Sequence, residues 1–352
     1  MKKHKKTADP FSPIRKLSPH IIQIDILKAF AIIAVILLHA LPLEFFIHIG
    51  SPYHLWHAVP LLILIAGFTS AYAYKRYGFT TLKQCYSPSL ILKRYKRLLI
   101  PFLICWIVEI AILFSIHQLS PDIVQVFLSL TRGGYGWGAY FIPVILQSIL
   151  IVPLLYLLAR QDPTRMVVIA LCISVLFDAV CILMGWNTDL TSFLYLRFMF
   201  AGALGVWLVT TDKYSTSWIV AGAGISLLYL TVSTYTPLLS AFPDYTGYGG
   251  VLQTPAFIWT AIIVITGIIY LPKDEESRTV RYLSEIGKAS WHIFLAQLLY
   301  YFLPAAYVYA YIVDPLSSGN MALQYILIVV CNLPICIGIG YVWYSCEKRI
   351  VK

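Results

Sequence analysis

Long apolar segments alternate with short polar ones along the whole chain of 352 residues. An apolar helix needs about 20 residues to cross the hydrocarbon core of a bilayer, and segments of that length recur between Pro, Gly and charged clusters. The expected fold class is therefore all-α, a polytopic membrane protein built as a bundle of about ten transmembrane helices. The predicted spans are residues 21–43, 55–74, 98–117, 139–159, 166–186, 191–209, 217–236, 254–272, 283–304 and 322–346.

The positions of Lys and Arg predict the orientation, because basic residues collect on the cytoplasmic side of membrane proteins. With ten alternating spans, 23 of the 26 Lys and Arg residues fall on one side, together with both chain ends. We expect a basic cytoplasmic N-terminal tail at residues 1–20, a membrane domain at 21–346 and a cytoplasmic C-terminal end at 347–352. The expected location is the plasma membrane.

Composition limits the class of partner. Apolar residues make up 59% of the chain and charged residues only 12%, which is too few to solvate a soluble globule of this size. The formal charge of +10 lies in short clusters between apolar segments, a pattern that indicates membrane orientation and no nucleic-acid partner. The seven Cys residues include no CxxC pair and no Cys/His ligand spacing, so we expect no metal site.

The first predicted helix contains Asp25, Lys28 and His39. Positions 28 and 39 are eleven residues apart, so at about 100° and 1.5 Å per residue they share one face at a separation of about 16 Å. Asp25 and Lys28 can form an ion pair at i, i+3. A lone Lys near a helix end can also snorkel to the headgroups, and a lone His near the other end can lie at the interface. At the depth of His39, however, polar groups commonly face the bundle interior, where a neutral imidazole can accept a proton from a hydroxyl.

A second basic cluster, Lys93–Arg97, precedes the third apolar segment. Arg94 and Arg97 are one helical turn apart and could bind an anionic ligand together, since a guanidinium group binds phosphate in a bidentate manner. Anchoring of the helix to lipid phosphates explains the same charges equally well. The pattern alone leaves both interpretations open.

Three further ionisable residues fall inside predicted spans: Glu109, Asp178 and Arg197. Each costs about 2.5 to 3.5 kcal/mol at the bilayer centre on insertion scales, so we expect each to pair or to face a cavity. Two longer segments lie on the opposite side from the basic clusters, residues 117–138 and 237–253. Either could cover a site, or they could be ordinary interfacial turns rich in Gly and Tyr.

Five motifs occur in order along nearly the whole chain, and together they resemble the membrane acyltransferase-3 family. They are Asp25-x-x-Lys28-x10-His39, Val59–Phe68, Arg94-x-x-Arg97 with Pro101, Gly136–Phe141 and Ile286–Gln297. The family consists of ten-helix proteins that move acyl groups, often acetyl or succinyl, from a CoA thioester to sugars of surface polysaccharides, glycolipids or other acceptors. The resemblance thus implies acyl-CoA as a co-substrate, a sugar or glycolipid acceptor, and no permanently bound cofactor.

The resemblance also assigns roles to residues of this chain. It makes His39 the essential catalytic residue, as a general base or as the carrier of a covalent acyl group, and it makes Arg94 and Arg97 the pair that handles the acyl donor. Lys28 stands where the family usually has Arg, so a positive charge is kept for the donor without bidentate geometry. Gln297 stands where the family often has His, which argues against proton transfer at that position.

Asp25, Glu109 and Arg197 are expected to support the site. The enzyme we expect is an O-acyltransferase. The alternative from a different class is a transporter or flippase of a lipid-linked sugar that uses the same buried charges to line its pathway. A purely structural membrane protein would leave Lys28, His39 and Arg197 dispensable.

Overall fold

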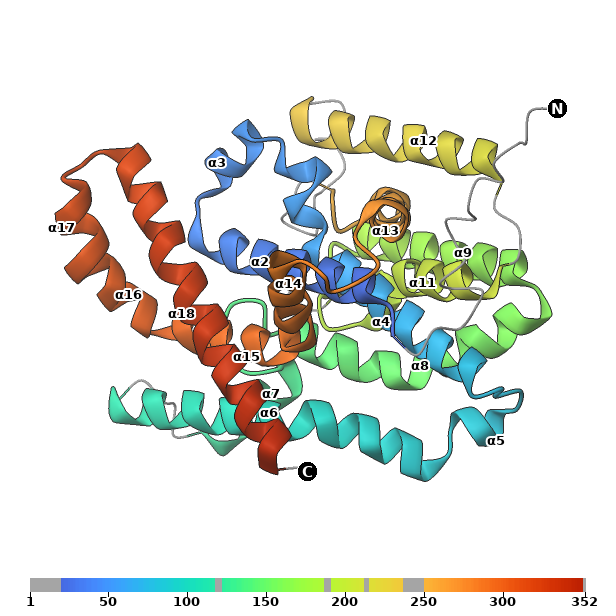
Figure 1. The fold of residues 1–352 in the computed structure, drawn as a ribbon, viewed down its shortest axis with the longest axis horizontal. Coiled ribbons are helices and arrows are strands. Elements are labelled where there is room, and N and C mark those ends of the chain that lie inside the picture. The colour runs from blue at the N-terminus through green and yellow to red at the C-terminus, as the bar shows by residue number, and fades with distance from the viewer. Residues whose placement is uncertain (1–19, 118–121, 187–190, 212–214, 237–249, 351–352) are drawn as a thin grey trace.

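The computed structural model describes residues 20–117, 122–186, 191–211, 215–236 and 250–350, so the predicted N-terminal tail lies outside the described residues except for His20. Over these residues the chain is helical and contains no strand (Figure 1). The longer elements are α2 (Ile22–Ala40), α4 (Ala58–Arg76), α6 (Pro88–Ser115), α8 (Phe141–Gln161), α9 (Pro163–Leu183), α11 (Met199–Thr210), α12 (Thr216–Tyr235), α13 (Phe257–Tyr270), α14 (Arg278–Lys288), α15 (Ser290–Phe302) and α18 (Met321–Ile350). The shorter elements are α3 (Leu43–His48), η1 (Ser51–Tyr53), η2 (Leu55–His57), α5 (Leu82–Cys85), α7 (Ile123–Arg132), η3 (Tyr195–Phe198), η5 (Thr254–Ala256), α16 (Pro304–Val308), η6 (Tyr309–Val313) and α17 (Asp314–Ser317).

The predicted all-α membrane fold is confirmed. Within the described residues, seven helices are long and apolar enough to cross a membrane, or eight if one bent pair counts as a single span. The sixth and eighth predicted spans coincide with shorter apolar helices, Tyr195–Thr210 and Thr254–Tyr270. All ten predicted ranges therefore contain apolar helix, while the number of complete crossings stays a prediction.

The ninth predicted span, residues 283–304, differs from the structure. Its first residues belong to α14, a largely polar helix that buries only Val280, Ser284 and Gly287. The apolar part begins at Ser290 and bends by 62° after Phe302, at the junction with α16. Pro304 at the start of α16 explains the break, because proline cannot donate the next hydrogen bond of α15.

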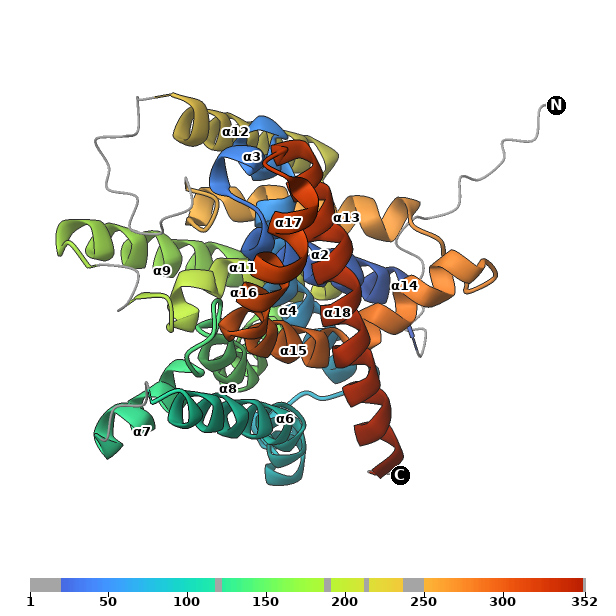
Figure 2. The same ribbon diagram turned by 90° about the vertical axis from the view of Figure 1, so that its left-hand side faces the viewer.

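The centre of the bundle is formed by α2 and α4, whereas α12 and α6 lie at opposite edges in both views (Figures 1 and 2). Burial agrees with this arrangement, because 61% of the apolar window of α2 and 67% of that of α4 is buried, against 11% for α12. The outer helices expose large apolar side chains such as Phe114, Leu176 and Trp218. Such a surface matches the lipid environment that the composition predicts.

Glycines bring α4 and α11 into backbone contact. A Cβ atom added at Gly67 of α4 would lie 2.3 Å from the carbonyl oxygen of Gly202, and one added at Gly205 of α11 would lie 2.0 Å from that of Leu64. Small residues at such seams let membrane helices approach closely, where dispersion rather than the hydrophobic effect holds them together. The seam fixes α4, and α4 in turn supports α2, the helix with the candidate site.

Candidate active site

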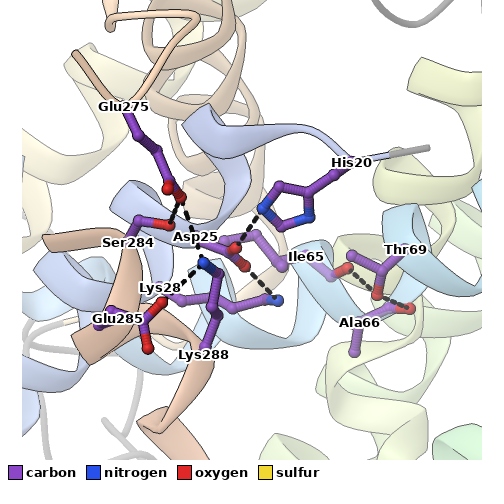
Figure 3. Close-up of polar contacts among 10 residues, drawn as sticks. All are labelled: His20, Asp25, Lys28, Ile65, Ala66, Thr69, Glu275, Ser284, Glu285 and Lys288. Atoms are coloured by element: carbon purple, nitrogen blue, oxygen red, sulfur yellow. Dashed lines mark hydrogen bonds and ion pairs between the residues drawn. The ribbon is translucent and has the colours of Figure 1, made fainter. Parts of the chain in front are cut away.

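At one end of α2, two basic groups hold the carboxylate of Asp25. Lys28 Nζ lies 3.1 Å from Asp25 Oδ1, as its i, i+3 spacing predicts, and His20 Nε2 lies 2.9 Å from Asp25 Oδ2. Figure 3 shows the two groups approaching different oxygens of the carboxylate. Asp25 is buried, so this pairing offsets the cost of placing its charge inside the protein.

A second ionic cluster lies beside the first, on α14 and the segment before it (Figure 3). Lys288 Nζ is 3.2 Å from Glu275 Oε1 and 2.9 Å from Glu285 Oε1, and the Ser284 hydroxyl donates to Glu275 Oε1 at 2.8 Å. The hydrogen bond from Ser284 and the interaction with Lys288 lower the pKa of Glu275, which keeps its carboxylate charged at neutral pH. Gly287 allows α14 to dock, since a Cβ there would lie 1.8 Å from the Asp25 carbonyl oxygen.

These clusters border a cavity of about 670 Å³, here called the basic cavity. Its cationic lining residues come from four different helices, α2, α6, α14 and α18. They are Lys28, Arg97, Lys288 and Lys348. The aromatic residues that line it are Phe141, Trp291, Phe294 and Tyr344.

The structure separates the two arginines of the basic cluster. Arg97 lines the basic cavity, whereas Arg94 is not among its lining residues. Instead, Arg94 Nη1 donates to the Tyr74 hydroxyl at 2.5 Å, and its guanidinium carbon lies 4.7 Å from the centre of the Tyr74 ring. The family resemblance assigns both Arg94 and Arg97 to the acyl donor. Although the two are one helical turn apart, only Arg97 lines the basic cavity.

At the other end of α2, His39 lies in the last turn and faces the bundle interior. Its Nδ1 atom is 2.7 Å from Gln297 Oε1 on α15. The edges of Tyr301 and Trp137 enclose the imidazole, with ring centroids 5.9 and 6.5 Å away. A Cβ atom at Gly138 would lie 2.9 Å from His39 Cε1, so only glycine allows this loop to pass the ring. The motif comparison argued only against proton transfer at Gln297, and the structure makes this residue the hydrogen-bond partner of His39.

Beside His39 is a much smaller cavity of about 50 Å³, here called the small cavity. Its lining is mostly apolar and comes from α2, α4 and the segments that cover them. The lining residues are Val35, Leu38, His39, Trp56, Val59, Gly138, Tyr140, Phe141, Leu252 and Phe294. Among these described residues, His39 is the one side chain that can act as a base near neutral pH.

Two phenylalanines line both cavities. Phe141, at the start of α8, and Phe294, on α15, meet edge to face with ring centroids 5.2 Å apart. The basic cavity and the small cavity are therefore neighbours, divided by this aromatic pair. Lys28 and His39 lie on opposite sides of it, on the one helix face that their spacing predicts.

Glu109 of α6 is buried and binds the glycine-rich segment that the sequence marked as a possible cover. Its two carboxylate oxygens accept the backbone N–H groups of Tyr135 at 3.1 Å and of Gly136 at 3.2 Å. These residues directly precede Trp137 and Gly138, which contact His39. Glu109 thus acts on the site through backbone hydrogen bonds, a partnership that spacing along the sequence does not reveal.

Arg197 lies away from both cavities. It belongs to η3, is buried, and its guanidinium carbon lies 5.5 Å from the centre of the Phe198 ring. Asp178 of α9 accepts the backbone N–H of Thr254 at 3.1 Å. No group of three or more His, Cys, Asp or Glu side chains that could hold a metal ion occurs in the part of the chain that the structure describes.

A bundle of apolar helices around a half-buried imidazole, with a basic cavity nearby, defines a polytopic membrane protein with a site suited to group transfer. A family profile described as an acyltransferase domain matches residues 21–341. The chain therefore belongs to the acyltransferase-3 family and is a membrane O-acyltransferase. Neither a curated protein nor a solved structure matches it.

Proposed function

We propose that this membrane acyltransferase uses acyl-CoA as the donor, binds it in the basic cavity, and transfers a short acyl group at His39 to a hydroxyl of a sugar or glycolipid. The observation that supports this most directly is the pair of neighbouring cavities. Four cationic side chains line the large one together with the carboxylates of Asp25 and Glu347, the candidate base lines the small one, and Phe141 and Phe294 line both.

The basic cavity suits the phosphates and the pantetheine arm of CoA. Lys28 and Arg97 offer charge to phosphate oxygens from two different helices, and Lys288 and Lys348 add charge from two further helices. Its volume of about 670 Å³ lies within the range of roughly 300 to 1,000 Å³ that is typical of ligand sites. The donor is a co-substrate in this proposal, with no resident cofactor.

The reaction then needs one base. His39 Nε2 removes the proton of the acceptor hydroxyl as its oxygen attacks the thioester carbonyl, the C–S bond breaks, and the thiolate leaves as CoA after taking up that proton. An acyl-imidazole formed on His39 and then resolved by the hydroxyl gives the same products. The small cavity, at about 50 Å³ against about 670 Å³ for the basic cavity, supports a short acyl chain.

Trp137 supports a sugar acceptor. Its side chain is 65% exposed although it lies beside His39. An exposed aromatic face next to the base offers a flat apolar surface on which a sugar ring can lie with a hydroxyl directed at the imidazole. Trp137 lines neither cavity, so in this proposal the acceptor would approach His39 separately from the donor.

The same arrangement supports an orientation in the plasma membrane with the basic cavity and both termini in the cytoplasm, where CoA is made. Reporter fusions at residue 50 and at the C-terminus should report opposite sides. The same side for both would overturn this topology.

The decisive test is consumption of acyl-CoA by the purified protein in lipid nanodiscs. Labelled acetyl-CoA with a mixture of membrane glycolipids should yield free CoA and labelled ester, and His39→Gln should yield neither. A wild-type protein that binds glycolipid but never consumes acyl-CoA would favour the transporter class instead.

A further inference from the structure

The hydrogen bond between His39 and Gln297 determines more than the position of the ring. Within the described residues, Gln297 is the one hydrogen-bond partner of His39, and it is fully buried. We propose that Gln297 is a positioning residue that holds His39 in its Nδ1–H tautomer and so directs the lone pair of Nε2 toward the acceptor hydroxyl. This inference rests on the proposed function, in which His39 acts at its Nε2 atom.

The tautomer follows from the chemistry of the two groups. An amide oxygen can only accept a hydrogen bond, so the nitrogen that faces Gln297 Oε1 at 2.7 Å must donate, and Nδ1 has the proton. In a neutral imidazole the other nitrogen then has a free lone pair. Nε2 faces the space left by Gly138, where a Cβ atom would lie 3.3 Å from it. The glycine therefore keeps open the position that the reacting hydroxyl needs.

The neutrality of the amide suits this part of the protein. The titratable side chains around the imidazole are the phenols of Tyr140 and Tyr301, and no carboxylate or ammonium group is among the described residues that line the small cavity. A carboxylate at position 297 would favour the charged imidazolium, which cannot accept a proton. An amide orients the ring in the same way and leaves it neutral and basic.

Packing alone does not account for a glutamine here. Gln297 Nε2 is buried and has no hydrogen-bond partner among the described residues. An unpaired buried donor costs free energy that an apolar side chain of similar length would avoid. The contact between α15 and α2 has a second polar link that does not need Gln297, because the Tyr301 hydroxyl donates to the Ile36 carbonyl at 3.0 Å. The amide oxygen, which accepts the hydrogen bond from His39 Nδ1, is thus the part of Gln297 that acts in the site.

Kinetics of two variants test the proposal. Gln297→Met removes the acceptor and keeps the shape, and we expect kcat to fall about 10- to 100-fold with KM for acetyl-CoA unchanged. Gln297→Glu should move the acidic limb of the pH–kcat profile to higher pH by roughly one unit or more, because the carboxylate favours imidazolium. A purely structural role would lower the amount of folded protein and leave that limb in place, and this result would overturn the proposal.

A matched control is Gln147→Met. Gln147 also lies in a transmembrane helix, and its side chain bonds the Phe193 carbonyl at 2.5 Å and the Tyr195 N–H at 3.1 Å, away from both cavities. Its loss should cost stability without lowering the kcat of the folded protein. An equal fall of kcat in Gln147→Met and Gln297→Met would contradict a specific role for Gln297.

The tautomer can also be measured without turnover. Nitrogen NMR of the purified protein with labelled histidine should show an Nδ1–H signal that His39→Gln removes and that Gln297→Met broadens or shifts. An Nε2–H tautomer at His39 in the wild-type protein would overturn the inference, whatever the activity. The Nδ1–H tautomer in a protein that never consumes acyl-CoA would instead sink the proposed function and leave the tautomer assignment standing.

Discussion

The two ends of α2 hold their ionisable groups by different means. Near its start, Asp25 forms an ion pair with Lys28 at 3.1 Å and contacts His20 Nε2 at 2.9 Å, beside a cavity of about 670 Å³. Near its end, His39 is held by a neutral amide at 2.7 Å, beside a cavity of about 50 Å³ with mostly apolar walls. One helix thus places a charged and a neutral polar site about four turns apart.

The difference follows from the space that each end can open to water. A wide cavity at the end of a span can hydrate charged groups, and charged groups can bind a charged ligand. A narrow apolar cavity strengthens every electrostatic interaction and penalises an extra charge, which suits a base that must stay neutral. The comparison therefore supports the proposal of donor binding at the basic end and the chemical step at the His39 end.

The largest expected effect is on kcat, at the His39 end of α2. His39→Ala should lower kcat by about 10² to 10⁴-fold or more, because it removes the base. Insertion should be unaffected, since the change removes a polar group from an apolar helix.

Lys28→Ala should raise KM for acetyl-CoA roughly tenfold and keep most of kcat, since one charged hydrogen bond of about 1.5 kcal/mol is lost. Steady-state kinetics in nanodiscs measures kcat and KM for both variants. A similar loss of kcat in His39→Ala and Lys28→Ala would contradict the division of α2 into a donor-binding end and a catalytic end.

Glu109→Gln tests how the His39 end is built. A glutamine has one acceptor oxygen in place of two, so one backbone N–H of the segment at Tyr135 and Gly136 loses its partner, and Trp137 and Gly138 shift against His39. We expect kcat to fall about tenfold to a hundredfold with KM for acetyl-CoA unchanged, because a misplacement of about 1 Å at a site can cost that much.

The control for Glu109→Gln is Asp162→Ala, which also removes a carboxylate acceptor of backbone N–H groups. Asp162 Oδ1 also accepts two backbone N–H groups, those of Thr164 and Arg165, and it lines neither cavity. This variant should keep wild-type kcat. Wild-type kcat in Glu109→Gln as well would show that the glycine-rich segment holds its place without the carboxylate.

At the basic end, the two arginines should differ. Arg97→Ala removes a charge that lines the cavity and should raise KM for acetyl-CoA about tenfold, the equivalent of about 1.4 kcal/mol. Arg94→Ala removes the contact with Tyr74 and should lower thermal stability while changing KM less than threefold, roughly the loss of a weak long-range interaction. Binding of a fluorescent CoA analogue separates the two effects, and an equal rise in KM would return Arg94 to the donor site.

The smallest expected effect concerns the size of the acyl group. Leu252→Ala enlarges the small cavity, so the ratio of kcat/KM for butyryl-CoA to that for acetyl-CoA should rise roughly fivefold, within the range expected for one or two methylene groups. Leu208→Ala removes an equally buried leucine that lines neither cavity and should lower stability without changing the ratio. An unchanged ratio in Leu252→Ala would mean that the acyl chain lies elsewhere.

Much of the fold follows from local pattern, because the length and composition of an apolar helix are properties of one segment. The placement of Lys28 and His39 on one face of α2 also follows from spacing within that segment. The bend after Phe302 is local too, but the apolar pattern continues through Pro304 and hides it. The polar character of α14 is what shortens the ninth predicted span.

The partners of the site residues could not be predicted in this way. Gln297 meets His39 across 258 positions, and Glu109 meets Tyr135 across 26 positions and a change of helix. Neither spacing corresponds to a period of any secondary structure, so tertiary packing alone decides them. Arg97 lines the basic cavity whereas Arg94 does not, because Tyr74 on a neighbouring helix binds Arg94 instead.

Phe294 and Gln297 are three residues apart on the short helix α15, which ends at the 62° bend. α15 therefore links the boundary between the two cavities to the orientation of His39, because Phe294 packs against Phe141 and Gln297 bonds His39 from the same helix. Removal of the Phe294 ring should widen the boundary and admit water to the thioester without removing the hydrogen bond that orients His39. Without acceptor, we expect hydrolysis of acyl-CoA, measured as release of free CoA, to be slow. In Phe294→Ala this hydrolysis should become faster relative to acyl transfer, because the boundary between the cavities is open while Gln297 stays in place.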